Sequence, residues 1–330
     1  MNPIYFFELS GESGDLPEAE AISCAKAESG GKAVKASSGP GYVTMEIPPD
    51  SLPFISKRLA LTRGIGRYLG SFEPDDMSGF APGDLPGGTF AVRAKRFRGM
   101  MADADSQKIV RKVGDIFSKR NSVDLNEPDI VVRMFMSDRV HIFIEEYKTE
   151  ADLFEKRKVS ERPFFSPISL HPKYARALIN LTGAVRGSTI LDPFCGTGGI
   201  AIEAAEMGMM ALVSDFDPHM VAGTMENMEF YGLKLHDSAV LDIGDIAERW
   251  SDIDVVATDP PYGRSTRTGG ENVDHMYTRS MSSISDVLRP GGRAGVVLPH
   301  KFETQYMSLQ DVYPQRVHSS LTRYYHLFRK

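Results

Sequence analysis

The fold is decided by Leu191-Asp192-Pro193-Phe194-Cys195-Gly196-Thr197-Gly198-Gly199, which joins the end of an apolar run to the start of a helical pattern. A strand, a glycine-rich turn and a helix in this order place the turn at the carboxyl edge of an open sheet, where main chain can approach a ligand closely. A dinucleotide site begins its turn with a glycine aimed at pyrophosphate, whereas here Asp192 ends the strand. Because its carboxylate would repel phosphate, the turn favours a cationic ligand.

Strands and helices alternate along the rest of the chain after this turn. The expected strands span residues 189–192, 211–215, 238–241, 255–259 and 294–298, and the expected helices span residues 198–207, 218–231 and 277–288. Such alternation predicts an α/β domain with a doubly wound, mostly parallel sheet and right-handed crossovers.

Acidic residues also follow the second and third expected strands. Asp215 ends the second strand, where a carboxylate typically binds ribose hydroxyls. Asp217 comes directly before a proline and is better explained as the N-cap of the next helix. After the third strand, Asp242 and Asp245 are both candidates to accept a hydrogen bond from an adenine amine. The turn Gly244-Asp245-Ile246 favours Asp245 of the two.

These acceptors fit a ligand that combines positive charge, a ribose and an adenine. S-adenosylmethionine is such a ligand, because it carries an ammonium and a sulfonium group. We therefore expect it to be the cofactor. The predicted cofactor contacts are Asp192, Phe194, Gly196, Gly198, Asp215, Phe216, Asp245 and Ile246.

A second motif, Asp259-Pro260-Pro261-Tyr262, follows the apolar run at residues 255–258 and so lies at the same edge of the sheet. The lone pair of an aromatic amine is delocalised, and acceptors on its two N–H groups orient the amine and localise density on nitrogen. Asp259 and the Pro260 carbonyl supply two acceptors on a loop that the prolines stiffen, and Tyr262 offers a ring for an extruded base. The motif predicts in-line methyl transfer to a base amine, without Cys195 as a nucleophile.

Composition restricts the class of protein further. A length of 330 residues suits two domains, or three small ones. A net charge of −6 argues against indiscriminate binding to phosphate backbones. Nowhere do eighteen apolar residues run together, so we expect a cytoplasmic protein without a membrane partner. Cys24 and Cys195 are too few for a disulfide framework or a zinc site, and no metal is predicted.

The N-terminal half has a different pattern, typical of small α+β units. Expected strands at residues 4–9 and 41–47 and helices at 17–27 and 51–61 precede a connecting loop rich in Gly and Pro at 71–88. Strands at 89–95, 130–136 and 140–145 and a helix at 106–120 follow, and residues 91–120 are locally basic. A charged, Pro-containing segment at 147–167 suits an interdomain linker.

The sequence resembles archaeal tRNA guanosine-10 N2-methyltransferases over nearly its whole length. Beyond the two motifs, the resemblance rests on Phe90–Arg96 and Val123–Asp129, which are similar to THUMP signatures, and on Arg162-Pro163-Phe164-Phe165, the segment from His171 to Arg176, and Asp259 through Ser265. It implies a ferredoxin-like domain at residues 1–70, a THUMP RNA-binding domain at 71–146, a linker at 147–166 and a Rossmann-like class I methyltransferase domain at 167–330.

The resemblance also implies what several residues do. The THUMP module would grip the acceptor end of tRNA, with Arg93, Lys95 and Arg96 in contact with RNA, and Arg264 would contact RNA beside the tetrad. The tetrad would be the guanine N2 site, with Asp259, Pro260 and Tyr262 as its catalytic residues. His171 would lie near the methionine end of the cofactor, although a lone histidine is more often structural.

Three other functions share parts of this pattern. The same tetrad would serve a guanine-N2 methyltransferase that acts elsewhere in tRNA, or on ribosomal RNA. It also permits a DNA adenine-N6 methyltransferase, which the THUMP-like segment and the lack of an obvious duplex-reading helix oppose. A non-catalytic RNA-binding protein is opposed by the two intact motifs. The number of methyl groups added stays open, and a monomer is expected.

Overall fold

The computed structural model describes residues 2–150, 152–166, 169–262 and 272–330. It divides into two compact units, each described by itself. Unit 1 comprises residues 1–12, 28–57 and 61–149, and unit 2 comprises residues 13–27, 58–60 and 150–330. The domain boundaries predicted at residues 70, 146 and 166 stay predictions, since compact units need not coincide with evolutionary domains.

Unit 1 is built on an eight-stranded sheet in the order β2-β3-β1-β4-β8-β7-β5-β6. Its strands are β1 (Ile4–Leu9), β2 (Val34–Gly39), β3 (Tyr42–Glu46), β4 (Thr62–Phe72), β5 (Thr89–Arg96), β6 (Ser122–Val123), β7 (Ile130–Met136) and β8 (Val140–Lys148). Strand β5 pairs in parallel with β6 and β7, whereas the other pairs are antiparallel. The short elements η1 (Pro49–Ser51) and α2 (Leu52–Arg58) connect β3 to β4.

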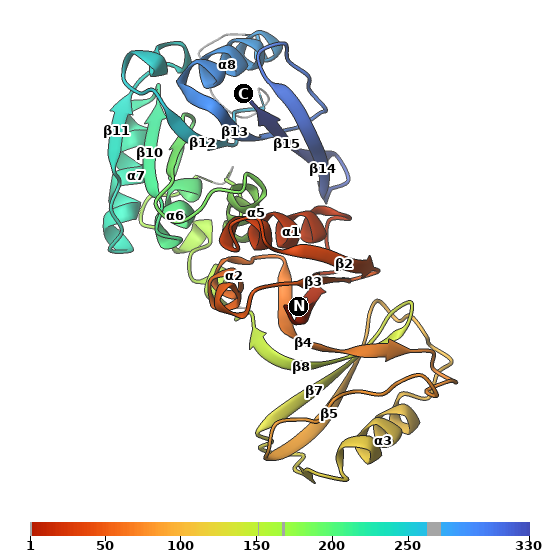
Figure 1. Cartoon of the computed structure of the whole chain (residues 1–330). Coiled ribbons are helices and arrows are strands. Elements are labelled where there is room, and N and C mark those ends of the chain that lie inside the picture. The colour runs from red at the N-terminus through yellow and green to blue at the C-terminus, as the bar shows by residue number, and fades with distance from the viewer. Residues whose placement is uncertain (1, 151, 167–168, 263–271) are drawn as a thin grey trace. The chain divides into compact units, whose positions relative to one another are not determined.

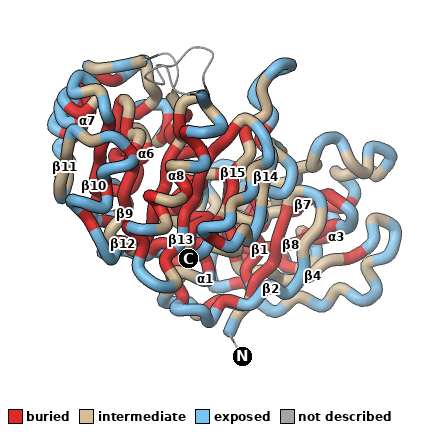
Figure 2. The backbone as a smooth tube through the Cα atoms, turned by 90° about the horizontal axis from the view of Figure 1, so that it is seen from above, coloured by how far each residue is buried: buried red, intermediate tan, exposed pale blue. Residues whose placement is uncertain are grey.

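Strands β7 and β8 carry apolar side chains on both faces of this sheet. Successive side chains along a strand point to opposite faces, so neighbouring residues of one strand join different clusters. Met134 and Ile142 lie in a cluster with α3 (Ser106–Phe117), whereas Phe135 and Phe143 join Phe6 in a separate aromatic cluster. Figure 1 shows α3 packed along the sheet of unit 1. The central strands are correspondingly the most deeply buried segments of unit 1 (Figure 2).

Unit 2 contains a seven-stranded sheet in the order β11-β10-β9-β12-β13-β15-β14. Its strands are β9 (Thr189–Asp192), β10 (Met210–Asp215), β11 (Asp237–Val240), β12 (Ile253–Thr258), β13 (Leu288–Leu298), β14 (Ser308–His318) and β15 (Leu321–Arg329). The first five pair in parallel, while β15 runs antiparallel to both β13 and β14. The predicted doubly wound, mostly parallel sheet is confirmed.

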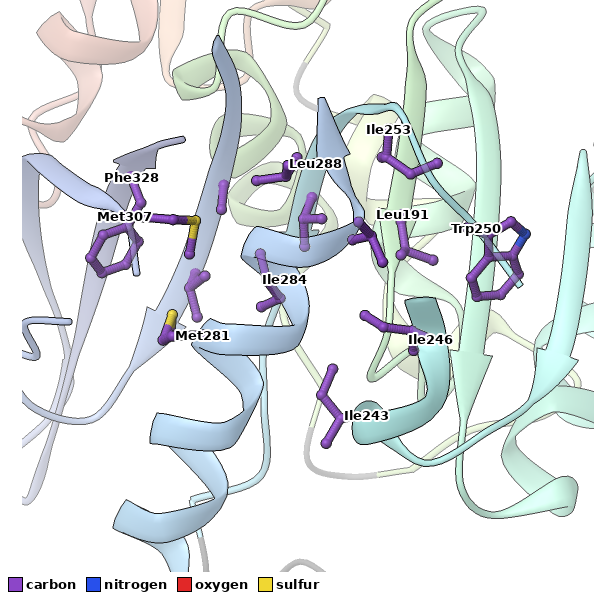
Figure 3. Close-up of a cluster of buried hydrophobic side chains, with 14 of the residues drawn as sticks. Leu191, Ile243, Ile246, Trp250, Ile253, Met281, Ile284, Leu288, Met307 and Phe328 are labelled. Atoms are coloured by element: carbon purple, nitrogen blue, oxygen red, sulfur yellow. The ribbon is translucent and has the colours of Figure 1, made fainter. Parts of the chain in front are cut away.

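Unit 2 also contains the helical elements α1 (Leu16–Glu28), α4 (Asp152–Glu155), η2 (Val159–Glu161), α5 (Pro172–Leu181), α6 (Gly199–Glu206), α7 (Pro218–Phe230), η3 (Ile243–Glu248) and α8 (Val273–Val287). Of these, α5, α6, α7 and α8 pack against strands of the sheet. Helix α8 and η3 bury one face, where Ile246 and Ile284 pack against Leu191 of β9 (Figure 3). None of the described helices combines the length and apolar character that crossing a bilayer requires.

Buried charged side chains hold the segment between β8 and the glycine-rich turn against the rest of unit 2. Glu203 of α6 is fully buried and accepts a 2.7 Å hydrogen bond from Arg157 Nε and another of 2.7 Å from Arg176 Nε. Arg162 is also buried and donates to Thr197 in the turn at 3.1 Å. Such charge-assisted bonds fix the segment against the helix that follows the turn.

Candidate active site

The glycine-rich turn connects β9 to α6 through two residues with positive φ. Gly196 has φ +51° and Gly198, the N-cap of α6, has φ +77°. A Cβ on Gly198 would lie 2.8 Å from the Thr224 side chain, so only glycine allows this approach of α7. A Cβ on Gly196 would meet nothing within 4 Å, so this side of the turn is open. The turn therefore packs closely against α7 at Gly198 and leaves space for a ligand at Gly196.

Asp192 ends β9 as a buried carboxylate with few partners. Its Oδ1 accepts a 2.7 Å hydrogen bond from the Thr258 hydroxyl and a 3.3 Å bond from the Phe194 amide. Burial raises the pKa of Asp192 to about 7, because a charge in this apolar surrounding is costly and the charges of Asp215 and Asp259 add to the cost. A cation bound here would relieve that cost.

Asp215 ends the neighbouring strand β10 and fixes the turn from the side. Its Oδ2 accepts from the Gly196 amide and its Oδ1 from the Asp217 amide, each at 3.1 Å. Burial raises the pKa of this carboxyl. Asp217 caps α7 by accepting from the His219 amide at 2.9 Å, so the N-cap interpretation of Asp217 is confirmed. Phe216 lies between them with 42% of its surface exposed.

The two candidates for the adenine contact differ in their partners within the protein. Asp242 caps η3 by accepting from the Gly244 amide at 2.8 Å, and it forms an ion pair with Arg279. Asp245 is exposed, and among the described residues no side-chain or main-chain donor binds its carboxylate. Ile246 is fully buried in the core, which leaves only its main chain to contact a ligand.

The residues at this edge fit S-adenosylmethionine. Two buried carboxylates whose pKa values are raised by burial lie beside a turn that is open at Gly196, and an exposed aromatic ring follows one of them. Asp192 suits the cationic end, Asp215 the ribose, and Phe216 and Asp245 the adenine. Phe194 is half-buried and packs against the core beside the turn.

The tetrad begins one residue after β12 ends, on the same edge of the sheet. Tyr262 donates a 2.5 Å hydrogen bond to Asp259 Oδ1. Tyr277 of α8 donates a 3.0 Å bond to the Pro261 carbonyl. Among the described residues, no donor binds the Pro260 carbonyl. The loop thus presents a carboxylate and a carbonyl from a backbone that Tyr277 supports from within the core.

The pKa values of the tetrad side chains depend on burial and on one cation, Arg323, which lies outside the sequence motifs. Burial raises the pKa of Asp259, whereas the Arg323 charge and the Tyr262 hydrogen bond oppose the rise. Burial and the Asp259 charge together raise the pKa of Tyr262 well above its ordinary range, so its hydroxyl stays a donor. Arg323 lies on β15, which sequence periodicity does not reveal as a strand because its buried positions do not alternate simply.

Comparisons with known proteins agree with this architecture. A family model described as the RMKL-like methyltransferase domain matches residues 160–324, and a THUMP domain model matches residues 78–145. The tRNA (guanine(10)-N2)-dimethyltransferase of Methanothermobacter thermautotrophicus is 34% identical over 327 residues, which cover 96% of each chain. The chain belongs to this family. Its predicted resemblance to THUMP-containing guanosine-10 N2-methyltransferases is thereby confirmed, and the chain is an enzyme of the tRNA guanine-N2 methyltransferase type.

Further matches extend the likeness. The protein of the same name from Pyrococcus abyssi is 36% identical over 288 residues, covering 83% of this chain and 85% of its own. The solved structure of TrmN from Thermus thermophilus has a TM-score of 0.54 at 20% identity and covers 99% of each chain. This structural likeness supports the fold, a Rossmann-like methyltransferase domain preceded by an α+β module with a THUMP domain.

In this member of the tRNA (guanine(10)-N2)-dimethyltransferase family, the three basic residues predicted to contact RNA on β5 are engaged within unit 1. Lys95 forms an ion pair with the buried Glu8, and Arg96 donates to the carbonyls of Met101 and Ala104. Arg93 donates to the Leu125 carbonyl. Each of the three side chains therefore has a structural role within unit 1. Their predicted contact with RNA stays untested, and Arg264 lies outside the described residues.

A different basic surface lies on α3 of the same unit. Lys108, Arg111 and Lys112 are exposed on the helix, and Lys119 follows just beyond its end. Within the described parts of the chain, no acidic side chain pairs with any of these four residues. We call them the α3 basic face. The sequence showed this segment as basic, but only the helix shows that its cations share solvent-exposed positions.

His171 has the structural role that a lone histidine usually has. It is the N-cap of α5, and its Nδ1 accepts from the Lys173 amide at 3.3 Å. Its Nε2 lies 3.5 Å from Glu155. Burial lowers the pKa of His171, so the ring favours the neutral form that can accept this bond. Its predicted contact with the cofactor stays a prediction.

Proposed function

We propose that this chain transfers methyl groups from S-adenosylmethionine to the exocyclic N2 amine of guanosine 10 in tRNA. The observation that carries the proposal is that Asp192 ends β9 and Asp259 follows the paired parallel strand β12 at one edge of the sheet, where Thr258, the residue before Asp259, donates a 2.7 Å hydrogen bond to Asp192 Oδ1. The names of the relatives, and the THUMP domain that the chain shares with its family, support tRNA as the substrate and position 10 as the target. They favour this function over a DNA adenine methyltransferase.

The cofactor would be held by residues that come from three neighbouring strands. Asp192 holds the cationic end, Asp215 binds the ribose hydroxyls, and Asp245 accepts from the adenine amine while Phe216 covers the ring. The bound cofactor supplies an electrophilic methyl group on a sulfonium. The open side of the turn at Gly196 lets main chain come close to it.

The tetrad would prepare the target amine. Asp259 and the Pro260 carbonyl each accept one N–H of the amine, which fixes the nitrogen and raises its electron density toward the methyl carbon. Tyr262 stacks on the extruded guanine. The amine loses one proton as it gains a methyl group, and the carboxylate of Asp259 is placed to accept it. Alignment and charge placement account for the acceleration.

The RNA would be held in part by unit 1. The α3 basic face offers four cations without acidic partners among the described residues, which suits phosphate contacts that position a substrate without reading its sequence. We assign the acceptor end of tRNA to the THUMP-containing unit, and we expect the enzyme to act as a monomer. Arg93 remains a further candidate because it lies near the exposed Leu125.

The test is incubation of the purified chain with labelled cofactor and unmodified tRNA transcripts, followed by nucleoside analysis. We expect N2-methylguanosine, then N2,N2-dimethylguanosine, with loss of both when guanosine 10 is replaced by adenosine. Asp259→Ala should abolish transfer and leave cofactor affinity within about twofold, because Asp259 holds the amine and not the cofactor. Methylation that persists in the substituted transcript would assign another position, and turnover by Asp259→Ala would contradict the role of the tetrad.

A further inference from the structure

The hairpin formed by β14 and β15 extends past the carboxyl end of β13. Tyr324 pairs with Leu298, the last residue of β13, and Arg323 comes one position further along the hairpin. Arg323 pairs with Gln315 of β14 and has no partner on β13. Because Asp259 follows the end of β12 at the same edge, the hairpin brings Arg323 to the level of the tetrad.

Arg323 is an unusual residue for this position. Only 9% of its surface is exposed, and among the described residues nothing accepts a hydrogen bond from its Nε. A buried guanidinium with an unmatched donor is costly unless an opposite charge compensates it. The interaction between its charge and that of Asp259 raises the pKa of Arg323, and it opposes the rise that burial causes in the pKa of the carboxyl.

Other ionisable groups also interact with Asp259, and one of them, Tyr262, likewise lowers the pKa of the carboxyl through its hydrogen bond. They are Asp192 at the end of β9, Tyr262 in the tetrad, Tyr277 on α8 and Tyr325 on β15. All four are acids, neutral when protonated and negative when not, so none of them can place a positive charge beside Asp259. Among the described residues, Arg323 is therefore the cation that acts on this carboxylate.

We propose that Arg323 is a positioning residue that keeps Asp259 in its carboxylate form while the tetrad holds the target amine. This inference rests on the proposed function. A protonated Asp259 would lose an acceptor and could donate to the amine nitrogen, which would occupy the lone pair that must attack the methyl carbon. The cation opposes the effect of burial on the pKa of Asp259 and so favours the charged carboxylate.

The test is the pH dependence of single-turnover methyl transfer, measured from acid to neutral pH with saturating cofactor and tRNA. For Arg323→Gln we expect the acid limb to move upward by about 1 to 3 pH units, the range that an adjacent opposite charge typically accounts for. Arg323→Lys keeps the cation and should restore most of the shift. Arg316→Gln removes the same charge from an exposed position of the same hairpin and should leave the limb unchanged.

Other results would overturn the inference. A uniform loss of rate at every pH in Arg323→Gln would indicate a structural role, and a change confined to tRNA affinity and its salt dependence would indicate a phosphate contact. Should Arg323→Gln fail to fold, Arg323→Met keeps the aliphatic volume and carries the same expectation. A wild-type enzyme that makes no N2-methylguanosine refutes the proposed function, whereas an active enzyme with an unmoved limb in the variant refutes only the role of Arg323.

Discussion

The hydroxyl of Tyr262 and the carboxylate of Asp259 are hydrogen-bonded to each other across three positions of the tetrad, at 2.5 Å. One oxygen of the carboxylate is therefore engaged by the enzyme itself. An incoming amine can use the other oxygen, or the second lone pair of Oδ1. Tyr262 thus combines two features, a ring that can stack on a base and a hydroxyl that occupies one acceptor site of Asp259.

Two variants of Tyr262 separate these features. Tyr262→Phe keeps the ring and removes a hydroxyl that occupies only one acceptor site of the carboxylate, so we expect single-turnover methyl transfer within about threefold of wild type. Tyr262→Ala removes the stacking surface, which is typically worth about 1 to 3 kcal/mol per base, and should lower the rate at least about tenfold. The measurement is the rate at saturating cofactor. A loss in the phenylalanine variant as large as that in the alanine variant would show that the hydroxyl, and not the ring, is needed.

The bond from Tyr277 to the Pro261 carbonyl supports the tetrad from the core. Tyr277→Phe removes a 3.0 Å bond and leaves a carbonyl without its partner, with almost no change in volume. We expect a loss of about 1 kcal/mol in the free energy of unfolding and a fall in kcat of about tenfold, with cofactor affinity unchanged. Denaturant unfolding and single-turnover rates measure the two effects. A stability loss without a rate loss would mean that the loop holds its shape without this bond.

The methyltransferase sheet could be predicted from sequence because its signals are local. Strand β9 agrees with the expected range of 189–192, and the helix after it agrees within a residue, because a buried parallel strand and a glycine turn each have a strong pattern. The tetrad was likewise placed correctly after β12. Each of these features depends on residues that are adjacent in the chain.

Features that depend on distant contacts could not be predicted in this way. Strand β4 carries three glycines and was not predicted, yet a Cβ on Gly66 would lie 1.9 Å from the Ile144 carbonyl, so glycine is needed for the approach of β8. Arg323 was missed because its importance comes from a hairpin that reaches the tetrad from the far end of the chain. The role of Lys95 within unit 1 could not be predicted for the same reason, because its partner Glu8 lies on the first strand.

The raised pKa of Asp192 makes cofactor binding sensitive to pH. With a pKa of about 7, this carboxyl is largely protonated in the free enzyme below neutral pH, and a cationic ligand favours its charged form. The affinity for S-adenosylmethionine should therefore fall as the pH drops below about 7, by up to about tenfold per pH unit. Calorimetric titration at several pH values measures this. Asp192→Asn should bind more weakly and remove the pH dependence, so a variant with the wild-type slope would assign the proton to another group.

We expect different effects from replacing the α3 basic face and from replacing the basic residues of β5. Replacing Lys108, Arg111 and Lys112 with glutamine removes three exposed cations, so tRNA affinity should fall and its salt dependence should weaken by about one unit of slope per lost phosphate contact. The matched control replaces Lys32, Arg63 and Lys148, which are also exposed in unit 1, and should change little.

Lys95→Gln should instead lower the stability of unit 1, because the carboxylate of Glu8 is buried and would lose an ion-pair partner, while Arg133 stays at 3.5 Å. Filter binding over a range of salt concentrations and thermal unfolding distinguish the two effects. If the Lys95 variant unfolds like wild type but binds tRNA weakly, the ion pair with Glu8 opens when RNA arrives, and the RNA surface includes β5 as the sequence predicted. If the α3 variant binds like its control, the phosphate contacts lie elsewhere.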